Sequence, residues 1–460
     1  MPGSRVLLVF ILMVIPELVS AQSSMNVRLL CNWQDTTNAP VNGGGQHWND
    51  VWGFTWQGKE YAVIGGTNGA HVIDVDNCEE RDFLPGKAKG VVHRDYKTYG
   101  HYLYAVADEG ISTMQVYDFS YLPDSLHLVW ESSQHELANS HTIFIDTAKA
   151  RLYCASAYSL GSGHNNLMVY SLADPAKPEL ISVINAFDNT HALYVRNDTA
   201  WCSNGNSGYL VLDMSGLPTV KIIGGLINYP YKGFNHSSWI GYNEIGVMAD
   251  ETFGRPVKII DARNPEVIEV MSSFSPRGLD TTSIPHNPYL LGQYVIMSYY
   301  MDGLQIYDIS DPAQPRQVGY YDTYPLPDGQ KFAGAWGAYP YLPSRRILVS
   351  DMQTGLYVLD AAAATPKLSV RSGSQRSVLS IYPNPSDDKV YLNLPQALYG
   401  RLEVSVFSTT GAMVRQLALD LTGGAYPPLE VSLPAECGPG MYVLRAVIGG
   451  QSYTARFTKR

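Results

Sequence analysis

Short apolar strands alternate with polar turns along most of the chain, in a unit that repeats. In each unit an apolar strand and a turn lead to a second strand that ends in small or acidic residues. A Gly-containing loop then leads to a third strand that closes on Asp, and a Pro-rich turn precedes the fourth; the clearest copies span 141–184 and 286–321. The units open 45 to 50 residues apart, at Asp50, Asp95, His141, His191, His236, His286 and Trp336. Four short strands in about 45 residues predict a β-propeller, in which each repeat forms one blade.

Seven openings predict seven blades over residues 25–361. The last repeat contains three strands and no fourth, whereas the segment NVRLLCNW (26–33) has the pattern of a fourth strand without its first three. We expect this N-terminal strand to complete the last blade, because closing the ring removes two unpaired strand edges. The Asp at the end of most third strands is predicted to be structural, since Asp before a turn accepts hydrogen bonds from backbone amides two residues later.

Beyond the repeats, the two ends of the chain have different patterns. Residues 362–377 are small and polar and predict a linker, and residues 378–460 alternate in the manner of a small, Ig-like β-sandwich. The predicted fold class is therefore all-β. At the other end, Arg5 precedes the apolar run 6–15, and small residues at 19–21 offer a cleavage site. This order predicts a secretory signal peptide at 1–21, and we expect no transmembrane anchor because no later stretch approaches eighteen apolar residues.

Charge and cysteine content narrow the classes of partner. The formal net charge is −10 with no basic run, so nucleic acid is not an expected partner. The chain has 5 Cys, and in an exported protein Cys31 and Cys78 are candidates for a disulfide. Cys154 and Cys202 occupy equivalent places in successive repeats, one blade apart, which is too far for a bridge. No cysteine pair has the spacing of a zinc site.

Candidate chemistry lies at the blade openings. Four consecutive repeats open with His, and second strands end with carboxylates; strand-one starts and strand-two ends share one face of an antiparallel blade. We therefore expect imidazoles and carboxylates to converge at one mouth of the central channel, a combination that suits Zn, Fe or Mn, whereas carboxylates alone would suit Ca. The candidate metal ligands are His141, His191, His236 and His286. The candidate ligand-binding residues are Asp50, Trp52, Arg94, Asp95, Glu109, Asp250, Glu251, Trp336 and Asp351.

Three interpretations of the histidines remain open at this stage. Each ring could be a structural element bonded to the backbone of the next blade, part of a ligand pocket, or part of a divalent metal centre. A binding module would need only a polar and aromatic mouth. A metal-dependent extracellular enzyme would need at least three of these groups to point at one centre.

The C-terminal segment resembles a known family. SIYPNPSDD (380–388), STTGAMV (408–414) and GMYVLRAV (440–447) are similar to the C-terminal sorting domain of Bacteroidetes type IX secretion substrates. This resemblance implies that the type IX secretion machinery is a partner through residues 378–460. It also implies passage through the outer membrane, removal of the tail, and display on the cell surface or release.

The repeats resemble the choice-of-anchor B family, whose blades carry LVIVD-type repeats. The resemblance rests on segments such as HRDYKTYGHYLYAVADE (93–109), SHTIFID (140–146), FNHSSW (234–239), GLQIYDIS (303–310) and GAWGAYPYLPS (334–344). The fourth repeat departs from the expected pattern, since NTHA (189–192) has no acidic residue after His. The resemblance implies no particular reaction, so we expect an unknown surface ligand and a binding role.

Overall fold

Every regular element among the described residues of the computed structural model is a β-strand. The model describes residues 23–41, 45–187, 190–241, 243–278, 282–366, 380–393, 399–408, 413–422, 428–434, 437–448 and 451–460. Within these ranges no helix could cross a membrane. The predicted signal peptide at 1–21 and most of the predicted linker at 362–377 lie outside the described residues.

The strands between residues 24 and 360 form seven antiparallel sheets in the described chain. Five are built from four consecutive strands, and the other two each include one strand from the N-terminal segment. Sheet 1 comprises β3 (Trp48–Trp56), β4 (Lys59–Gly66), β5 (Gly69–Asp74) and β6 (Glu79–Pro85). Sheet 2 comprises β7 (Arg94–Tyr99), β8 (Tyr102–Ala107), β9 (Gln115–Asp118) and β10 (His127–Glu131). Sheet 3 comprises β11 (Asn139–Asp146), β12 (Arg151–Ser159), β13 (Gly163–Ser171) and β14 (Glu179–Ile184). Sheets 4 and 5 comprise β15 (Ala192–Arg196), β16 (Thr199–Ser203), β17 (Tyr209–Asp213), β18 (Lys221–Leu226); and β19 (Asn235–Ile240), β20 (Ile245–Asp250), β21 (Val257–Asp261), β22 (Glu269–Phe274). Sheet 6 comprises β23 (Pro288–Leu291), β24 (Tyr294–Ser298), β25 (Leu304–Asp308), β26 (Arg316–Tyr321) and the short β1 (Ser24–Met25), and sheet 7 comprises β27 (Ala335–Tyr339), β28 (Arg346–Asp351), β29 (Gly355–Asp360) and β2 (Arg28–Trp33).

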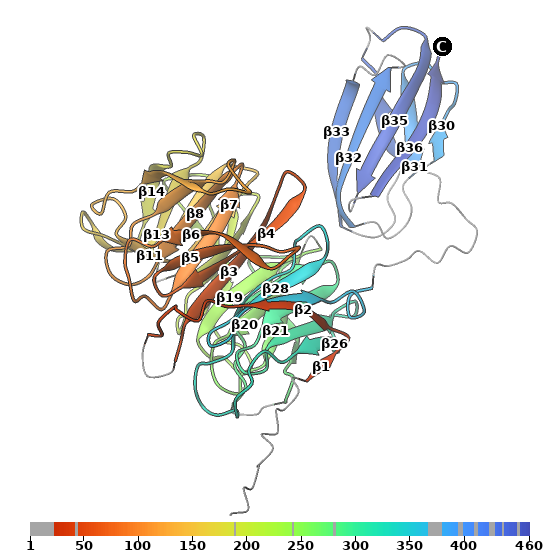
Figure 1. The fold of residues 1–460 in the computed structure, drawn as a ribbon. Coiled ribbons are helices and arrows are strands. Elements are labelled where there is room, and N and C mark those ends of the chain that lie inside the picture. The colour runs from red at the N-terminus through yellow and green to blue at the C-terminus, as the bar shows by residue number, and fades with distance from the viewer. Residues whose placement is uncertain are drawn as a thin grey trace, which may run out of the picture.

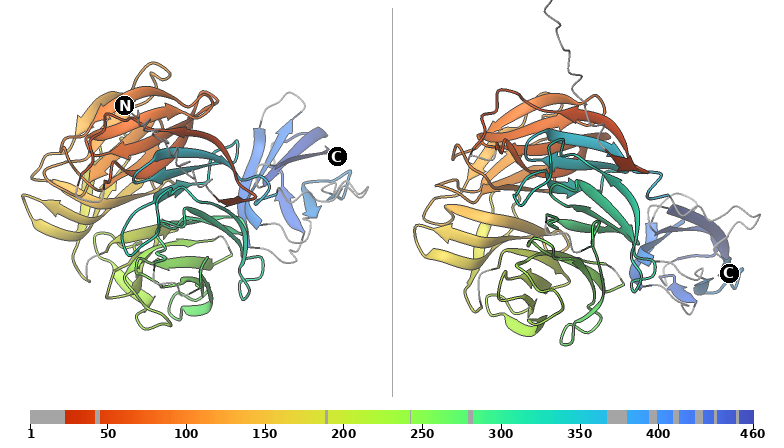
Figure 2. Two further views of the ribbon diagram at one scale, coloured as in Figure 1. Left: turned by 60° about the horizontal axis from the view of Figure 1, so that its bottom comes forward. Right: turned by 90° about the horizontal axis from the view of Figure 1, so that it is seen from below.

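The sheets follow one another around a common centre, as in a β-propeller (Figure 1; Figure 2). The apolar core is divided into clusters that lie between neighbouring sheets, and one of them joins sheet 7 to sheet 1. Inner strands such as β4 and β5 are buried along nearly their whole length, whereas outer strands such as β14 alternate between exposed and buried residues. This explains the continuous apolar runs of the inner strands, which are covered on both faces.

The ring is closed by the N-terminal strand. As predicted, β2 pairs with β29 and supplies the fourth strand of sheet 7. A disulfide joins Cys31 in β2 to Cys78, in the turn between β5 and β6 of sheet 1, so a covalent bond ties the last sheet to the first. Cys154 and Cys202 are buried free thiols. The sequence did not predict β1, which pairs with β26 at the edge of sheet 6.

The Asp residues that end the third strands are structural. In six of the repeats the Asp side chain accepts a hydrogen bond from the backbone amide two residues later: Asp74, Asp118, Asp213, Asp261, Asp308 and Asp360. The turn therefore needs the carboxylate, as predicted from its position.

The C-terminal segment forms two further sheets. They comprise β30 (Ser380–Tyr382), β31 (Lys389–Asn393) and β34 (Leu429–Ser432) in one sheet, and β33 (Met413–Thr422), β32 (Tyr399–Ser408), β35 (Gly440–Ile448) and β36 (Gln451–Lys459) in the other. One apolar cluster contains side chains from both, such as Val390 and Val431 from the first and Val404 and Leu444 from the second. The segment thus has its own core.

Candidate functional site

The first strand of each sheet faces the centre, and local irregularities aim several side chains there. The pairing of β19 with β20 shifts register between Asn235 and Ser237, and that of β27 with β28 shifts between Ala335 and Gly337. The residues left between are His236 and Trp336. A bulge of this kind redirects a side chain that a regular strand would place on another face.

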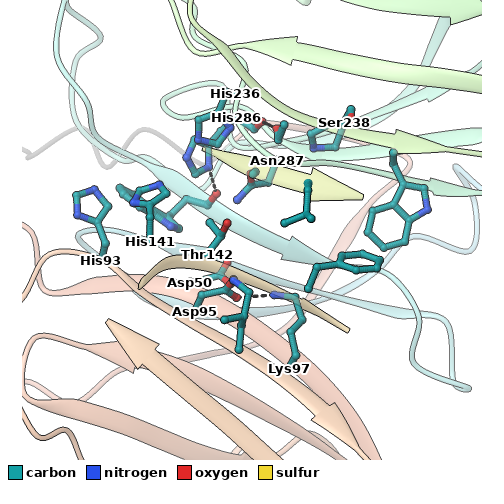
Figure 3. Close-up of a pocket in the computed structure, with 18 of the residues that line it drawn as sticks. Asp50, His93, Asp95, Lys97, His141, Thr142, His236, Ser238, His286 and Asn287 are labelled. Carbon is teal, nitrogen blue, oxygen red and sulfur yellow. Dashed lines mark hydrogen bonds and ion pairs between the residues drawn. The ribbon is translucent and has the colours of Figure 1, made fainter. Parts of the chain in front are cut away.

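Sheets 2 to 7 each contribute one aromatic residue to a closed ring around the centre, which we call the histidine ring. Its centroid distances are His93–His141 5.3 Å, His141–His191 4.0 Å, His191–His236 4.3 Å, His236–His286 4.3 Å, His286–Trp336 4.9 Å and Trp336–His93 5.0 Å. The four histidines singled out in the sequence are therefore consecutive members of one ring. Figure 3 shows four of the five histidines at one end of a pocket.

Carboxylates hold one side of the ring. His93 Nδ1 lies 2.6 Å from Glu109 Oε1, and His141 Nδ1 lies 2.8 Å from Asp108 Oδ2. Burial opposes a charge on His93, but the hydrogen bond and charge of Glu109 outweigh it and raise the pKa of His93. Burial acts likewise on Glu109 and Asp108, yet the partner histidines hold the pKa of each carboxyl below its ordinary value. These pairs leave the Nε2 atoms of His93 and His141 for other contacts.

The other side of the ring is buried and held neutral. Burial and the neighbouring imidazoles keep the pKa of His191 and His236 well below the ordinary value. Burial lowers the pKa of His286 to about 3, although its hydrogen bond to the Trp336 carbonyl acts in the opposite direction. Because a carbonyl only accepts, His286 Nδ1 carries the proton and its Nε2 carries a lone pair.

Glu251 brings a carboxylate to these neutral imidazoles. Its oxygens lie 3.7 Å from His236 Nε2 and 3.8 Å from His286 Nε2. The Tyr300 hydroxyl donates a hydrogen bond to it, while burial raises the pKa of Glu251. Ligand atoms of His191, His236 and Glu251 lie within 4.8 Å of one another. Two imidazoles and a carboxylate at this spacing form a donor set that suits a divalent transition metal.

Two cavities meet at the histidine ring and share His93 and Trp336. The first, which we call the mouth, has a volume of about 320 Å³ and is lined by Glu251, Tyr300, Phe332, Gln46, Val92 and Met352 beside those two residues. The second, which we call the chamber, has a volume of about 100 Å³ and reaches from the ring to Asp50, Asp95 and Lys97 (Figure 3). A ligand at the ring is thus accessible from the mouth.

The predicted ligand-binding residues divide between these places. Glu109, Glu251 and Trp336 are at the histidine ring, whereas Asp50 and Asp95 line the chamber. Trp52 lies beside the chamber, where its Nε1 donates to Thr98.

The other three predicted residues make structural contacts: Arg94, which also lines the chamber, Asp250 and Asp351. Arg94 donates to the carbonyls of Gly66, Thr67 and Ala88, which ties sheet 2 to sheet 1.

Asp250 is fully buried in an ion pair with Lys258 at 2.7 Å, and it also accepts from Tyr229, Gly233 and Asn235. Asp351 accepts from Thr323 and from the amides of Gln353 and Thr354. The structure does not bring these two carboxylates to the ring.

The candidate residues chosen from the sequence leave out three residues at these sites. His93 completes the ring, but the second repeat was taken to open at Asp95; the histidines that open the next four repeats were the available signal. Asp108, next to the predicted Glu109, binds His141. Lys97 lines the chamber, with no sequence signal that sets it apart from a surface lysine.

Residues 380–460 match the family model of the secretion system C-terminal sorting domain. This confirms the predicted sorting domain and, with it, type IX export to the cell surface or the extracellular space. Comparison with curated proteins finds no match.

Among solved structures, the chain is similar to U3-55K, with 10% identity over 72% of this chain and 98% of that one, at a TM-score of 0.49. The WD40 β-propeller domain of Doa1 has 11% identity over 73% and 97%, at a TM-score of 0.48. The periplasmic gluconolactonase PpgL of Pseudomonas aeruginosa has 10% identity over 84% and 99%, at a TM-score of 0.49.

Proposed function

We propose that residues 25–361 are a seven-bladed β-propeller and that 378–460 are a small β-sandwich. Seven sheets in the described residues, six of four strands and one of five, support the blade number, since an apolar cluster lies between each neighbouring pair. The apolar cluster shared by the two C-terminal sheets supports the sandwich. We further propose that residues 1–21 and the C-terminal domain are removed during export.

We infer that the propeller is a binding module whose ligand site is the mouth at the histidine ring. The observation that carries this proposal is the closed ring itself, in which five imidazoles lie side by side and Glu251 approaches two of them, His236 and His286, beside a cavity. Convergent polar groups at a concavity are the usual form of a ligand site. Nothing in the packing of a propeller requires five histidines at one level.

The chemistry of the mouth favours a divalent transition-metal ion, or a ligand that carries one. Neutral imidazole nitrogens and a carboxylate oxygen are ordinary zinc ligands, with bonds of about 2.0–2.2 Å. Ligand atoms around tetrahedral zinc then lie about 3.4 Å apart. The donors of His191, His236 and Glu251, within 4.8 Å of one another, need to approach by about an ångström, which side-chain rotation supplies.

A metal-dependent extracellular enzyme is the second candidate function. The observation that favours it is the mouth cavity, which is lined by Glu251 and Tyr300 and so leaves space for a substrate beside one of the three metal donors. A catalytic metal site keeps a position open for water or substrate.

Metal analysis of the purified full chain tests the site, and a turnover assay separates the two functions. A binding module retains zinc and shows no hydrolysis of activated ester or phosphate substrates above a Glu251→Gln variant. An enzyme shows hydrolysis that is lost in that variant and upon metal removal. The proposal that the mouth is the ligand site is contradicted if the purified chain takes up no zinc and the His236→Ala variant gives the same result as the unaltered chain.

A further inference from the structure

The chamber on the other side of the histidine ring has a wall with two levels. Nearest the ring are polar residues, Asp50, Asp95, Thr142, Ser237 and Asn287. Farther along the same first strands are Lys97, Phe144, Trp239 and Tyr289. Trp239 is three residues beyond His236, which places it about 10 Å further along the strand.

The far level is part of an aromatic collar, which we define as Trp52, Phe144, Tyr194, Trp239, Tyr289, Tyr339 and Tyr341. Neighbouring rings in the collar have centroids 4.7 to 5.8 Å apart. Sheet 2 contributes Lys97 at this level, with its ammonium 4.6 Å from the Trp52 ring. Six sheets contribute aromatic rings to the collar, and sheet 2 contributes the Lys97 ammonium in place of a ring.

The charged groups that line the chamber already have partners within the fold. His93 pairs with Glu109, and the Arg94 guanidinium donates to the carbonyls of Gly66, Thr67 and Ala88. The Lys97 ammonium pairs with the Asp95 carboxylate, whose other oxygen accepts the amide of Ile143 at 2.7 Å. Burial, reinforced by the neighbouring Asp95, raises the pKa of Asp50 well above its ordinary value, which favours a protonated carboxyl. A cation entering the chamber would meet Lys97, and an anion would meet Asp95. Burial of a charged ligand without a partner of opposite charge costs desolvation free energy. A neutral ligand does not incur this cost.

The hydrogen-bonding groups of the chamber differ in how far the fold already uses them. Thr142 and Ser237 donate to the carbonyls of His191 and His286 in the next sheets. The carboxyl of Asp50 and the amide of Asn287 line the space itself. The Asp95 carboxylate also lines it, but accepts from Lys97 and from the amides of Tyr96 and Ile143 as well. Carboxyl and amide groups can accept from and donate to hydroxyls, and the rings of Phe144, Trp239 and Tyr289 offer flat apolar faces.

We propose that the chamber binds one residue of a neutral sugar, which enters from the collar end. Asp50, Asp95 and Asn287 hydrogen-bond its hydroxyls, and the collar rings pack against its apolar face. The volume of about 100 Å³ holds about three waters at about 30 Å³ each, so the chamber takes the hydroxyl-bearing edge of one six-membered sugar ring while the rest of the ring lies against the collar. The chamber is a separate site, so the proposal does not depend on metal or ligand binding at the mouth.

The test titrates D-glucose, D-galactose, D-mannose and N-acetyl-D-glucosamine separately into the full chain, followed by calorimetry and by saturation-transfer NMR. At least one sugar should bind at millimolar concentrations. Asp95→Asn and Trp239→Ala should each weaken that binding about tenfold or more, since a buried hydrogen bond to a charged group or a stacking face is lost. Tetramethylammonium and inorganic phosphate are the charged probes and should not bind.

Two controls keep the test decisive. Asn287→Ala removes only an amide that lines the chamber, so its loss of sugar binding with an unchanged melting temperature separates binding from folding. Phe332→Ala is the matched variant at the mouth, because Phe332 lines the mouth and not the chamber, and it should leave sugar binding unchanged. The proposal is overturned if none of the four sugars binds, if a charged probe binds instead, or if Asp95→Asn and Asn287→Ala both bind sugar as the unaltered chain does.

Discussion

The Nδ1 atom of His286 donates a hydrogen bond of 2.5 Å to the backbone carbonyl of Trp336 in the next sheet. The bond fixes which nitrogen of the imidazole carries the proton, and it leaves Nε2 with a lone pair that faces Glu251. It also supports in part the structural interpretation of the histidines, since one nitrogen serves the fold while the other faces the site.

Replacing His286 with Gln should make the stability of the propeller less sensitive to acid. The folded-state pKa of His286 is about 3, against an ordinary value of 6.5. As the pH falls below 6.5 the unfolded chain binds a proton that the folded chain does not, so folding stability decreases down to the folded pKa. At pH 5 the loss is about 2 kcal/mol from this group.

Urea unfolding at neutral pH and near pH 5 measures this effect. The unaltered chain should lose about 2 kcal/mol more than His286→Gln between the two conditions. Equal losses in the two chains would show that His286 is not buried in its neutral form.

The disulfide between Cys31 and Cys78 should stabilise the closure of the ring of sheets. The bond spans 47 residues and links sheet 7 to sheet 1. The chain-entropy model gives a stabilisation of about 4 kcal/mol for a loop of this length. A Cys31→Ser, Cys78→Ser double variant should therefore melt at a markedly lower temperature in calorimetry, and reductant should shift the unaltered chain but not the variant. An unchanged melting temperature would mean that the strand pairing of β2 alone closes the ring.

The buried carboxylate of Asp250 should contribute to folding stability and not to zinc binding at the histidine ring. Its removal in Asp250→Leu strands the fully buried ammonium of Lys258, which should cost about 3–5 kcal/mol. Replacing Lys258 with Met in the same chain should restore much of that stability. Denaturant unfolding measures both, and the double variant should bind zinc as the unaltered chain does. Loss of zinc binding in a stable double variant would show that Asp250 does contribute to the metal site.

Removing the C-terminal domain should stop surface delivery. The family match over 380–460 establishes the sorting domain, and the proposed linker at 362–377 precedes it. A chain that ends at residue 377 should accumulate in the periplasm of the source cell, with its signal peptide removed. Fractionation and N-terminal sequencing check both points. A truncated chain that still reached the surface would contradict the role of this domain.

The repeat spacing was enough to predict the sheets, the closing strand β2 and the ring of histidines, because these follow from strand order and antiparallel pairing. Which of two adjacent carboxylates faces the site was not predictable. Asp250 and Glu251 are neighbours at the end of one strand, and successive side chains point to opposite faces. The position of Lys258 inside the apolar strand VKIID was the one available sign that a buried anion lies nearby.

The sequence also could not place Asp50 and Asp95 relative to the ring. Both were expected at the mouth because they open repeats, but the backbone shift between Trp48 and Val51 and the earlier position of His93 put them in the chamber. A shift of one or two residues at a strand start changes the level at which a side chain meets the channel. Such shifts leave no mark in the apolar pattern.

Calorimetric titration of zinc into the metal-free full chain tests the central claim most directly. The account predicts one high-affinity site per chain, with affinity reduced at least about tenfold in His236→Ala and in Glu251→Gln, since each loses a ligand. His127→Ala removes an exposed histidine outside the ring and should bind zinc as the unaltered chain does. Absence of a zinc site, or a site that persists in both ring variants, would contradict the histidine ring as the ligand site of this protein.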